Sequence, residues 1–324
     1  MKTRYTLLAF LFLAQTALAQ QLPLFTQYRE YAGVINPASV PNDYLWYDKT
    51  LSFGASYRRQ WVTDKDGPAT QVLRGDYVWE RGRKGAYPII GGYLMNDKAG
   101  RMGMTGAYAR AAVLFTDEVK ERGFSVGLNA GVVRYGLDLS NARVRDINDI
   151  ALYEAQNRIF PDVGLGAYAY VTLGENENQL FGGVSIPQVI GLNVQFRNQN
   201  PNDPNKPCEI QIQRVQHYFA SAGYRIPLEE DLTFLEFSTW ARMVLPLGPQ
   251  FDFNFRAQLQ ESFFFGTGFS TNGNAHLDFG LNLGEDRLFR LGVGADFPFS
   301  KKFSIATYYG NSYEVNVAYA MGKQ

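Results

Sequence analysis

Apolar and polar residues alternate along most of the chain, with a period of two that recurs from segment to segment. Between Phe251 and Leu259 the odd positions are apolar and the even positions are Asp, Asn, Arg and Gln. Alternation of this kind places apolar side chains on one face of a β-strand and polar side chains on the other. The same pattern recurs at 163–173, 277–283, 289–297 and 313–319. The chain is therefore predicted to be all-β.

The length of the alternating runs separates two kinds of β-protein. Most runs span about ten residues, as a tilted membrane-spanning strand requires, whereas strands of soluble proteins average about five or six residues. The polar face consists largely of Gly, Ser, Asn, Gln and Tyr, with little Lys. These features favour a transmembrane antiparallel β-barrel. A soluble β-sandwich also alternates, with its apolar face inward, and is the alternative.

Turn-forming residues divide the pattern into fourteen predicted strands, within a range of twelve to sixteen. They lie at 51–61, 70–79, 87–96, 102–115, 122–135, 162–173, 179–186, 217–226, 232–244, 250–260, 262–270, 275–283, 288–297 and 312–321. Phe303–Tyr309 is an optional fifteenth strand, but barrels of this kind have even strand numbers, so 298–311 is predicted to be a loop. The longest connections, 136–161 and 187–216, then both fall on the exterior side.

The first residues have the layout of a secretory signal peptide. Lys2 and Arg4 precede a short apolar run, and Ala17-Leu18-Ala19 forms a small-x-small cleavage site. Residues 20–50 are too aromatic for a free tail and are expected to pack into the lumen or cap the periplasmic mouth. The predicted organisation is a signal peptide at 1–19, an N-terminal plug or cap segment at 20–50, and the barrel at 51–324.

Composition narrows the class of protein. The chain has 31 basic and 31 acidic residues and no basic stripe, which argues against a nucleic-acid partner. The single cysteine, Cys208, excludes an intrachain disulfide framework. A mean hydropathy of −0.23 argues against an α-helical membrane protein, although barrel strands expose only alternate residues to lipid. Aromatic residues make up 15% of the chain and glycines number 32, an excess that suits a barrel.

Few residues suggest catalysis. The two histidines, His217 and His276, are far apart and have no metal-binding spacing, and no cofactor is expected. His276 lies on the polar face of its strand and is expected to face the lumen. An outer-membrane lipid hydrolase that uses His276 remains one hypothesis, but the chain is predicted not to be an enzyme.

Charged residues on the polar faces of the later strands are candidates for lining the lumen. One interpretation is a salt-bridged, closed interior, and another is a selectivity lining for solutes. The Pro- and Asn-rich stretch Asn198–Pro207 is predicted to be a solvated loop without strand or helix. The candidate lining residues are Asp252, Arg256, Asp278, Arg290, Asp296 and Glu314.

Several short motifs, in order, resemble those of the PorP/SprF family of type IX secretion system outer-membrane proteins. The resemblance covers nearly all of the mature chain. At the closing strand, Tyr313 stands where a His more often precedes the Glu. The matching segments are Phe25-Thr26-Gln27-Tyr28, Asn36-Pro37-Ala38, Tyr57–Trp61 with Gly67–Gln71, Gly91–Gly100, Phe181–Pro187 and Ser312–Val315.

The resemblance implies a barrel without catalytic residues that serves secretion or surface attachment of an adhesin, including adhesins of gliding motility. Such a partner carries a C-terminal sorting domain, and other type IX secretion components and outer-membrane lipid are further expected partners. A porin or solute channel is the alternative function. Arg58 and Asn96-Asp97 are expected to pair with the plug, and Trp61 suits an interfacial anchor. The motif positions taken as structural or partner-binding candidates are Phe25, Gln27, Tyr28, Asn36, Pro37, Arg58, Gln60, Trp61, Asn96 and Asp97.

Overall fold

A computed structural model describes most of the chain. The described residues are 19–20, 25–80, 85–138, 156–198, 208–229, 233–245, 248–260, 262–284, 289–299 and 310–322.

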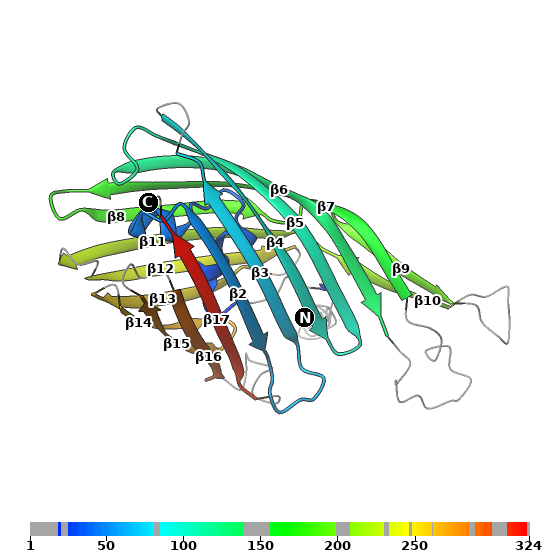
Figure 1. The fold of residues 1–324 in the computed structure, drawn as a ribbon. Helices are drawn as coiled ribbons and strands as arrows, with labels where there is room; N and C mark the ends of the chain where they lie inside the picture. The colour runs from blue at the N-terminus through cyan, green and yellow to red at the C-terminus, as the bar shows by residue number, and fades with distance from the viewer. Residues whose placement is uncertain are drawn as a thin grey trace, which may run out of the picture.

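Fourteen antiparallel strands form a closed barrel (Figure 1). Each strand pairs with its neighbours, and the last strand closes the barrel on the first, where Tyr313 lies opposite Arg59. The predicted fold class and the fourteen predicted strands are confirmed. The strands are β2 (Leu51–Arg59), β3 (Ala69–Val78), β4 (Gly85–Ala99), β5 (Met102–Thr116), β6 (Arg122–Leu137), β7 (Gln156–Leu173), β8 (Asn178–Ile186), β11 (His217–Glu229), β12 (Thr233–Val244), β13 (Gln250–Leu259), β14 (Phe263–Ser270), β15 (Asn274–Leu283), β16 (Phe289–Pro298) and β17 (Ser312–Met321).

Alternation along each strand separates an apolar outer surface from a polar interior. On β16, Leu291 is 40% exposed on the outer surface, whereas its neighbour Arg290 is 7% exposed. On β13, Phe253 faces outward, and Asn254 is buried inside. An apolar exterior around a polar interior is the arrangement of membrane-spanning barrels. Among the described residues, no helix is long and apolar enough to cross a membrane.

Two of the predicted strands were too short, and the assignment of Asn198 to a loop was wrong. β4 covers Gly85–Ala99 and β7 covers Gln156–Leu173, against the predicted 87–96 and 162–173. β5 and β6 lie within two residues of their predicted bounds. The connection 187–216 contains a hairpin of β9 (Leu192–Asn198) and β10 (Cys208–Arg214), so Asn198 ends a strand. Val194 and Phe196 of this hairpin pack into a buried cluster with Tyr135 of β6. This packing supports the strands where they extend beyond the exposed apolar side chains of the outer surface. Residues 199–207 and the optional strand 303–309 lie outside the described residues.

The connections identify the two ends of the barrel. Those at the end where β2 begins and β17 ends are short, such as 174–177 between β7 and β8. The opposite end carries the longest connections, 138–155 and 187–216, and the extended hairpin β9–β10 (Figure 1). Barrels of this class have short periplasmic turns and long exterior loops. We call the end with the long connections the outer mouth.

The N-terminal region runs through the barrel interior. Its described helical turns are η1 (Tyr28–Tyr31), α2 (Ala32–Ile35) and α3 (Asn42–Tyr47), and we call residues 25–47 the lumen segment. Upstream, the two-residue strand β1 (Ala19–Gln20) pairs in parallel with β10. The lumen segment begins beside the outer half of β17 at Glu314. It ends near Gly322, where the carbonyl of Asp48 lies close. The segment therefore crosses from the outer half of the lumen to the inner mouth.

Candidate functional site in the barrel lumen

The outer part of the lumen segment is held by carboxylates at the seam between β16, β17 and β2. The Glu314 carboxylate accepts backbone N–H bonds from Thr26 at 2.8 Å and from Gln27 at 3.1 Å. Arg58 pairs with Glu314 at 3.2 Å and with Asp296 at 2.7 Å. Each buried charge thus has an opposite charge or an N–H donor, without which burial would be costly.

Glycines on β16 make room for this contact. A Cβ atom on Gly292 would lie 2.3 Å from Oε1 of Gln27, and one on Gly294 would lie 2.9 Å from Cγ2 of Thr26. A Cβ atom at either position would force these side chains to move, so the two glycines make room for Thr26 and Gln27 against the wall. Gln27 also accepts a hydrogen bond from Asn316 of β17. The alternating Gly-x-Gly at 292–294 therefore serves packing inside the barrel.

A second group of charges lies further along the segment. Glu30 of η1 pairs with Arg74 of β3 at 2.9 Å and with Arg290 of β16 at 3.1 Å. Arg290 also contacts Asp43 of α3 at 2.8 Å. Burial raises the pKa of Glu30, but the guanidinium charges of Arg290 and Arg74 oppose it more strongly and leave the pKa below its ordinary value. Glu30 is therefore held as a carboxylate between two arginines on well-separated strands.

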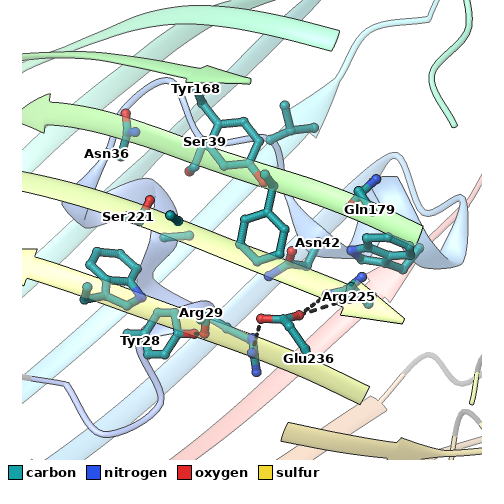
Figure 2. Close-up of a pocket in the computed structure, with 17 residues that line it drawn as sticks. Tyr28, Arg29, Asn36, Ser39, Asn42, Tyr168, Gln179, Ser221, Arg225 and Glu236 are labelled. Atoms are coloured by element: carbon teal, nitrogen blue, oxygen red, sulfur yellow. Dashed lines mark hydrogen bonds and ion pairs between the residues drawn. The ribbon is translucent and has the colours of Figure 1, made fainter. Parts of the chain in front are cut away.

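Glu236 of β12 forms a third group, which Figure 2 shows beside a small cavity. Its carboxylate contacts Arg29 of η1 and also Arg225 of β11, the latter at 2.5 Å. The Arg225 guanidinium lies 3.5 Å from the ring centre of Trp46 in α3 and 4.1 Å from that of Phe234. A cation stacked on aromatic faces gains a further electrostatic attraction. Two turns of the lumen segment are thus tied to neighbouring strands.

A tight turn at Asn36-Pro37 sits against β5 to β8. Oδ1 of Asn36 accepts the N–H of Ala38 at 2.9 Å, while its Nδ2 donates to the carbonyl of Ala167 at 3.0 Å. The carbonyl of Pro37 accepts from Nε of Arg110 at 2.8 Å, and Arg110 also pairs with Asp76 at 2.5 Å. The turn is therefore bonded both internally and to the wall, which explains the presence of a short amide side chain followed by proline.

Charges across this interface balance. The ion pairs between the segment and the wall, with their immediate partners, involve six arginines and six carboxylates. They are Arg29, Arg58, Arg74, Arg110, Arg225 and Arg290 with Glu30, Asp43, Asp76, Glu236, Asp296 and Glu314. This part of the lumen therefore carries no net charge that would attract ions of one sign.

Among the described residues, small cavities lie between the segment and the wall. One, of about 50 Å³, is lined by residues that include Trp46, Arg225 and Glu236 (Figure 2). Another, of about 80 Å³, lies toward the outer mouth beside Trp240, Arg242 and His276. A cavity that binds benzene has a volume of about 150 Å³, so each of these holds a few waters at most.

The structure brings most of the predicted motif residues to the lumen segment or its wall. Phe25 stacks on Tyr31 with ring centres 3.9 Å apart, and Tyr28 packs edge-on against Trp240. The Tyr28 hydroxyl also bonds Ser238. Arg58 pairs with the segment as expected, through Thr26. The aromatic residues of the motif therefore serve the interior contact.

Four motif residues lie elsewhere. The expectation that Asn96-Asp97 contact the plug was wrong: Asn96 points outward and accepts a bond from Thr105 at 2.9 Å, and Asp97 accepts one from Thr70 at 2.6 Å. Asn96 lies two positions beyond the exposed Leu94, toward the outer mouth, where the outward side chains are polar. Gln60 and Trp61 lie in the β2–β3 connection at the outer mouth, and Trp61 has a positive φ of 53°.

The candidate lumen-lining residues all point inward. Arg290, Asp296 and Glu314 belong to the ion pairs described above. Arg256 lies over the ring of Phe264 at 3.7 Å, Asp278 packs against Gly266, and Asp252 lines the cavity near the outer mouth. His276 is buried on the lumen side of β15. Among the described residues, no group of three or more His, Cys, Asp or Glu is placed to hold a metal ion.

Sequence reasoning missed eight charged residues of this interface. Five lie on inward faces of strands and three on the lumen segment, but no local signal indicated which charges meet. The missed residues are Arg74, Asp76, Arg110, Arg225 and Glu236 on the strands, and Arg29, Glu30 and Asp43 on the segment.

Comparison with protein families gives a match along almost the whole chain. The model of the type IX secretion system membrane proteins PorP/SprF matches residues 17–319. The chain belongs to the PorP/SprF family. Its fold is that of an outer-membrane β-barrel, and the resemblance inferred from the motifs is confirmed. Comparison with curated protein sequences gives no match.

Solved structures with a similar fold include two toluene transporters. The toluene transporter TbuX of Ralstonia pickettii has 9% sequence identity and a TM-score of 0.54, over 90% of this chain and 94% of TbuX. The toluene transporter TodX of Pseudomonas putida has 8% identity and a TM-score of 0.52, over 95% of this chain and 100% of TodX. At such identities the likeness concerns the fold alone.

Proposed function

We propose that this PorP/SprF barrel is a non-enzymatic docking component that holds a secreted adhesin at the outer membrane through the adhesin's C-terminal sorting domain. Family membership supports a role in type IX secretion, with other secretion components as partners. The observation that carries the docking role is the lumen segment. Because it is tied to opposite walls by buried ion pairs, the interior is poorly suited to passing a solute or a folded client.

The outer mouth is the surface that a secreted partner meets in this proposal. It carries the long connections and the hairpin β9–β10, which extends the barrel wall beyond the apolar band (Figure 1). The hairpin is anchored at its base, where Arg214 pairs with Asp162 of β7 and donates from Nε to Oε1 of Gln188 at 3.1 Å. An anchored hairpin offers a rigid edge for a protein contact.

The alternative function is a solute channel, because the transporters with a similar fold carry a small molecule. TbuX and TodX are described as toluene transporters, and their fold is shared. The interior cavities of about 50 and 80 Å³ in this chain are smaller than the roughly 150 Å³ needed for benzene. That comparison favours docking over hydrocarbon transport.

Trimming the hairpin tests the docking role. Gln195 and Gln211 are paired, so replacing residues 196–210 by Asn-Gly closes a shorter hairpin and keeps Arg214 in place. A strain that carries the trimmed protein is expected to lose most adhesin from its surface, measured by antibody labelling of whole cells, as in a deletion strain. Heat-dependent gel mobility controls for barrel assembly. Unchanged display in both strains would refute the proposal.

A further inference from the structure

A hollow interrupts the apolar outer surface of the barrel over β3 to β6. Its floor consists of four small residues that lie in register across the four strands, so that together they form one continuous low area. Larger residues lie one row away on each side: Leu73 and Leu94 toward the outer mouth, and Tyr77 and Ile90 toward the inner mouth. The floor residues are Gly75, Gly92, Ala109 and Ala130.

The hollow is large compared with the cavities inside the barrel. One part measures about 660 Å³ and is lined by residues that include Phe53, Tyr77 and Ile90. A second part, of about 540 Å³, shares Leu73, Leu94 and Ala107 with the first, so the two are continuous. Its rims are exposed apolar side chains, Leu94 at 54% and Ile90 at 51%. The surface is therefore a shallow, open apolar groove.

The outer end of the groove is polar. The row beyond Leu73 and Leu94 consists of Gln71, Asn96, Thr105 and Arg134, again in register. The exposed Arg134 donates through Nε to Asn157 at 3.0 Å. No carboxylate within the described ranges forms an ion pair with it, so its positive charge faces the surroundings. A change from apolar to polar outward residues marks the edge of the hydrocarbon layer.

The depth of the groove corresponds to one leaflet. From Gln71 to Tyr77 a strand advances six residues, or about 20 Å at roughly 3.3 Å per residue. With a strand tilt of about 40°, this is about 15 Å along the membrane normal. The hydrocarbon core is about 30 Å thick, so the groove spans about half of it. Because its polar end faces the outer mouth, the leaflet is the outer one.

We propose that this groove binds one lipid of the outer leaflet, with an acyl chain against the small residues and a phosphate group at Arg134. A guanidinium group suits a phosphate because its N–H donors match the phosphate oxygens. A protein partner that crosses the membrane would contact both leaflets. The groove instead ends at Tyr77 and Ile90, and exposed Leu128 and Phe124 stand on the inner half of β6.

Native mass spectrometry of the full-length protein, stripped of lipid in mild detergent, tests the site. The probes are phosphatidylethanolamine, lipid A and uncharged diacylglycerol. Ala109→Leu fills the floor from outside and is expected to weaken binding of the phosphorylated lipids at least about tenfold. Ala107→Leu is a second filling variant. Ala295→Leu is the matched control, since Ala295 is an outward alanine between Leu277 and Tyr313 on a distant part of the wall.

The headgroup contact has its own variant. Arg134→Gln is expected to reduce the preference for phosphorylated lipid over diacylglycerol about fivefold, whereas Arg122→Gln, at the inner end of β6, leaves it unchanged. Binding of phosphatidylethanolamine alone would identify a phospholipid, and binding of lipid A alone a glycolipid. Equal binding by Ala109→Leu and Ala295→Leu would overturn the proposal. So would a dimer of this chain that Ala109→Leu abolishes, because the groove would then be a protein contact.

Discussion

At the scale of single residues, the best-anchored buried charges have more than one partner. Glu30 is held between Arg74 and Arg290, and Glu314 between Arg58 and two backbone N–H groups. Removing one member of a buried pair leaves its partner uncompensated, at a cost of about 3–5 kcal/mol. Such residues stabilise this position of the lumen segment, since leaving it would break these ion pairs.

Stability is expected to depend on pH through Glu30. The folded protein holds the pKa of Glu30 below its unfolded value of 4.5, so its contribution is complete above that value and is lost as pH falls through the folded pKa. At pH 7, Glu30→Gln is expected to lower the free energy of unfolding by about 3 kcal/mol. The difference from wild type is expected to shrink toward pH 3.

Urea unfolding in lipid vesicles, followed by tryptophan fluorescence between pH 7 and pH 3, measures this difference. Other carboxylates titrate in both proteins and cancel. Glu175→Gln in the exposed β7–β8 turn is the control and is expected to stay within about 0.5 kcal/mol of wild type. A gap between Glu30→Gln and wild type that stays constant with pH would contradict the role given to Glu30.

At the scale of whole strands, glycines on β6 and β7 decide how closely the lumen segment approaches the wall. A Cβ atom on Gly127 of β6 would lie 2.3 Å from the carbonyl oxygen of Pro37, and one on Gly166 of β7 would lie 2.0 Å from Oδ1 of Asn36. Here the obstacle on Gly127 is backbone, which cannot rotate away. Two adjacent strands therefore accept the Asn36-Pro37 turn because they lack side chains at these positions.

Gly127→Ala is expected to push the turn off the wall and to destabilise the protein by about 1–3 kcal/mol, as overpacking does. Gly103→Ala on β5 is the control, because its Cβ would meet no atom within 4 Å. Unfolding midpoints measure the stability, and trypsin cleavage after Arg29 reports release of the segment. If both variants behaved alike, close packing at Gly127 would not matter.

The whole molecule is a barrel whose interior is occupied by its own chain. Ion pairs join the lumen segment to β3, β12 and β16, and Arg58 of β2 donates a hydrogen bond to Thr26, so displacing the segment would leave several buried charges without partners. The outward face is apolar and complements lipid, while the inward face complements the segment. A closed lumen and an extended outer rim are the features that the docking proposal uses.

Removing the lumen segment is expected to open a water-filled pathway. With residues 26–46 replaced by a short Gly-Ser linker, the remaining wall is lined by arginines and carboxylates, which favour water. Planar-bilayer recordings are expected to give steady ohmic current for this variant and little for the intact protein. The hairpin-trimmed protein controls for the loss of residues. Equal current through intact and deleted proteins would instead support the channel alternative.

Strand number and the facing of each side chain were predictable from the sequence. Phe253 and Asn254 point in opposite directions in any β-strand, so alternation reveals the two faces without knowledge of the neighbours. The even strand number then followed from closure of the barrel. Asn96 shows the limit of inferring direction from polarity. It is polar but points outward, because it lies beyond the lipid layer, where outward positions need not be apolar.

Which inward residues meet one another was decided only by the tertiary structure. Arg58 and Glu314 are 256 positions apart and pair because β17 closes on β2. Glu30 meets Arg74 and Arg290 because the segment passes between distant strands. Alternation is local and survives in the sequence, whereas the closure of the barrel and the path of the chain through it depend on the register of all fourteen strands.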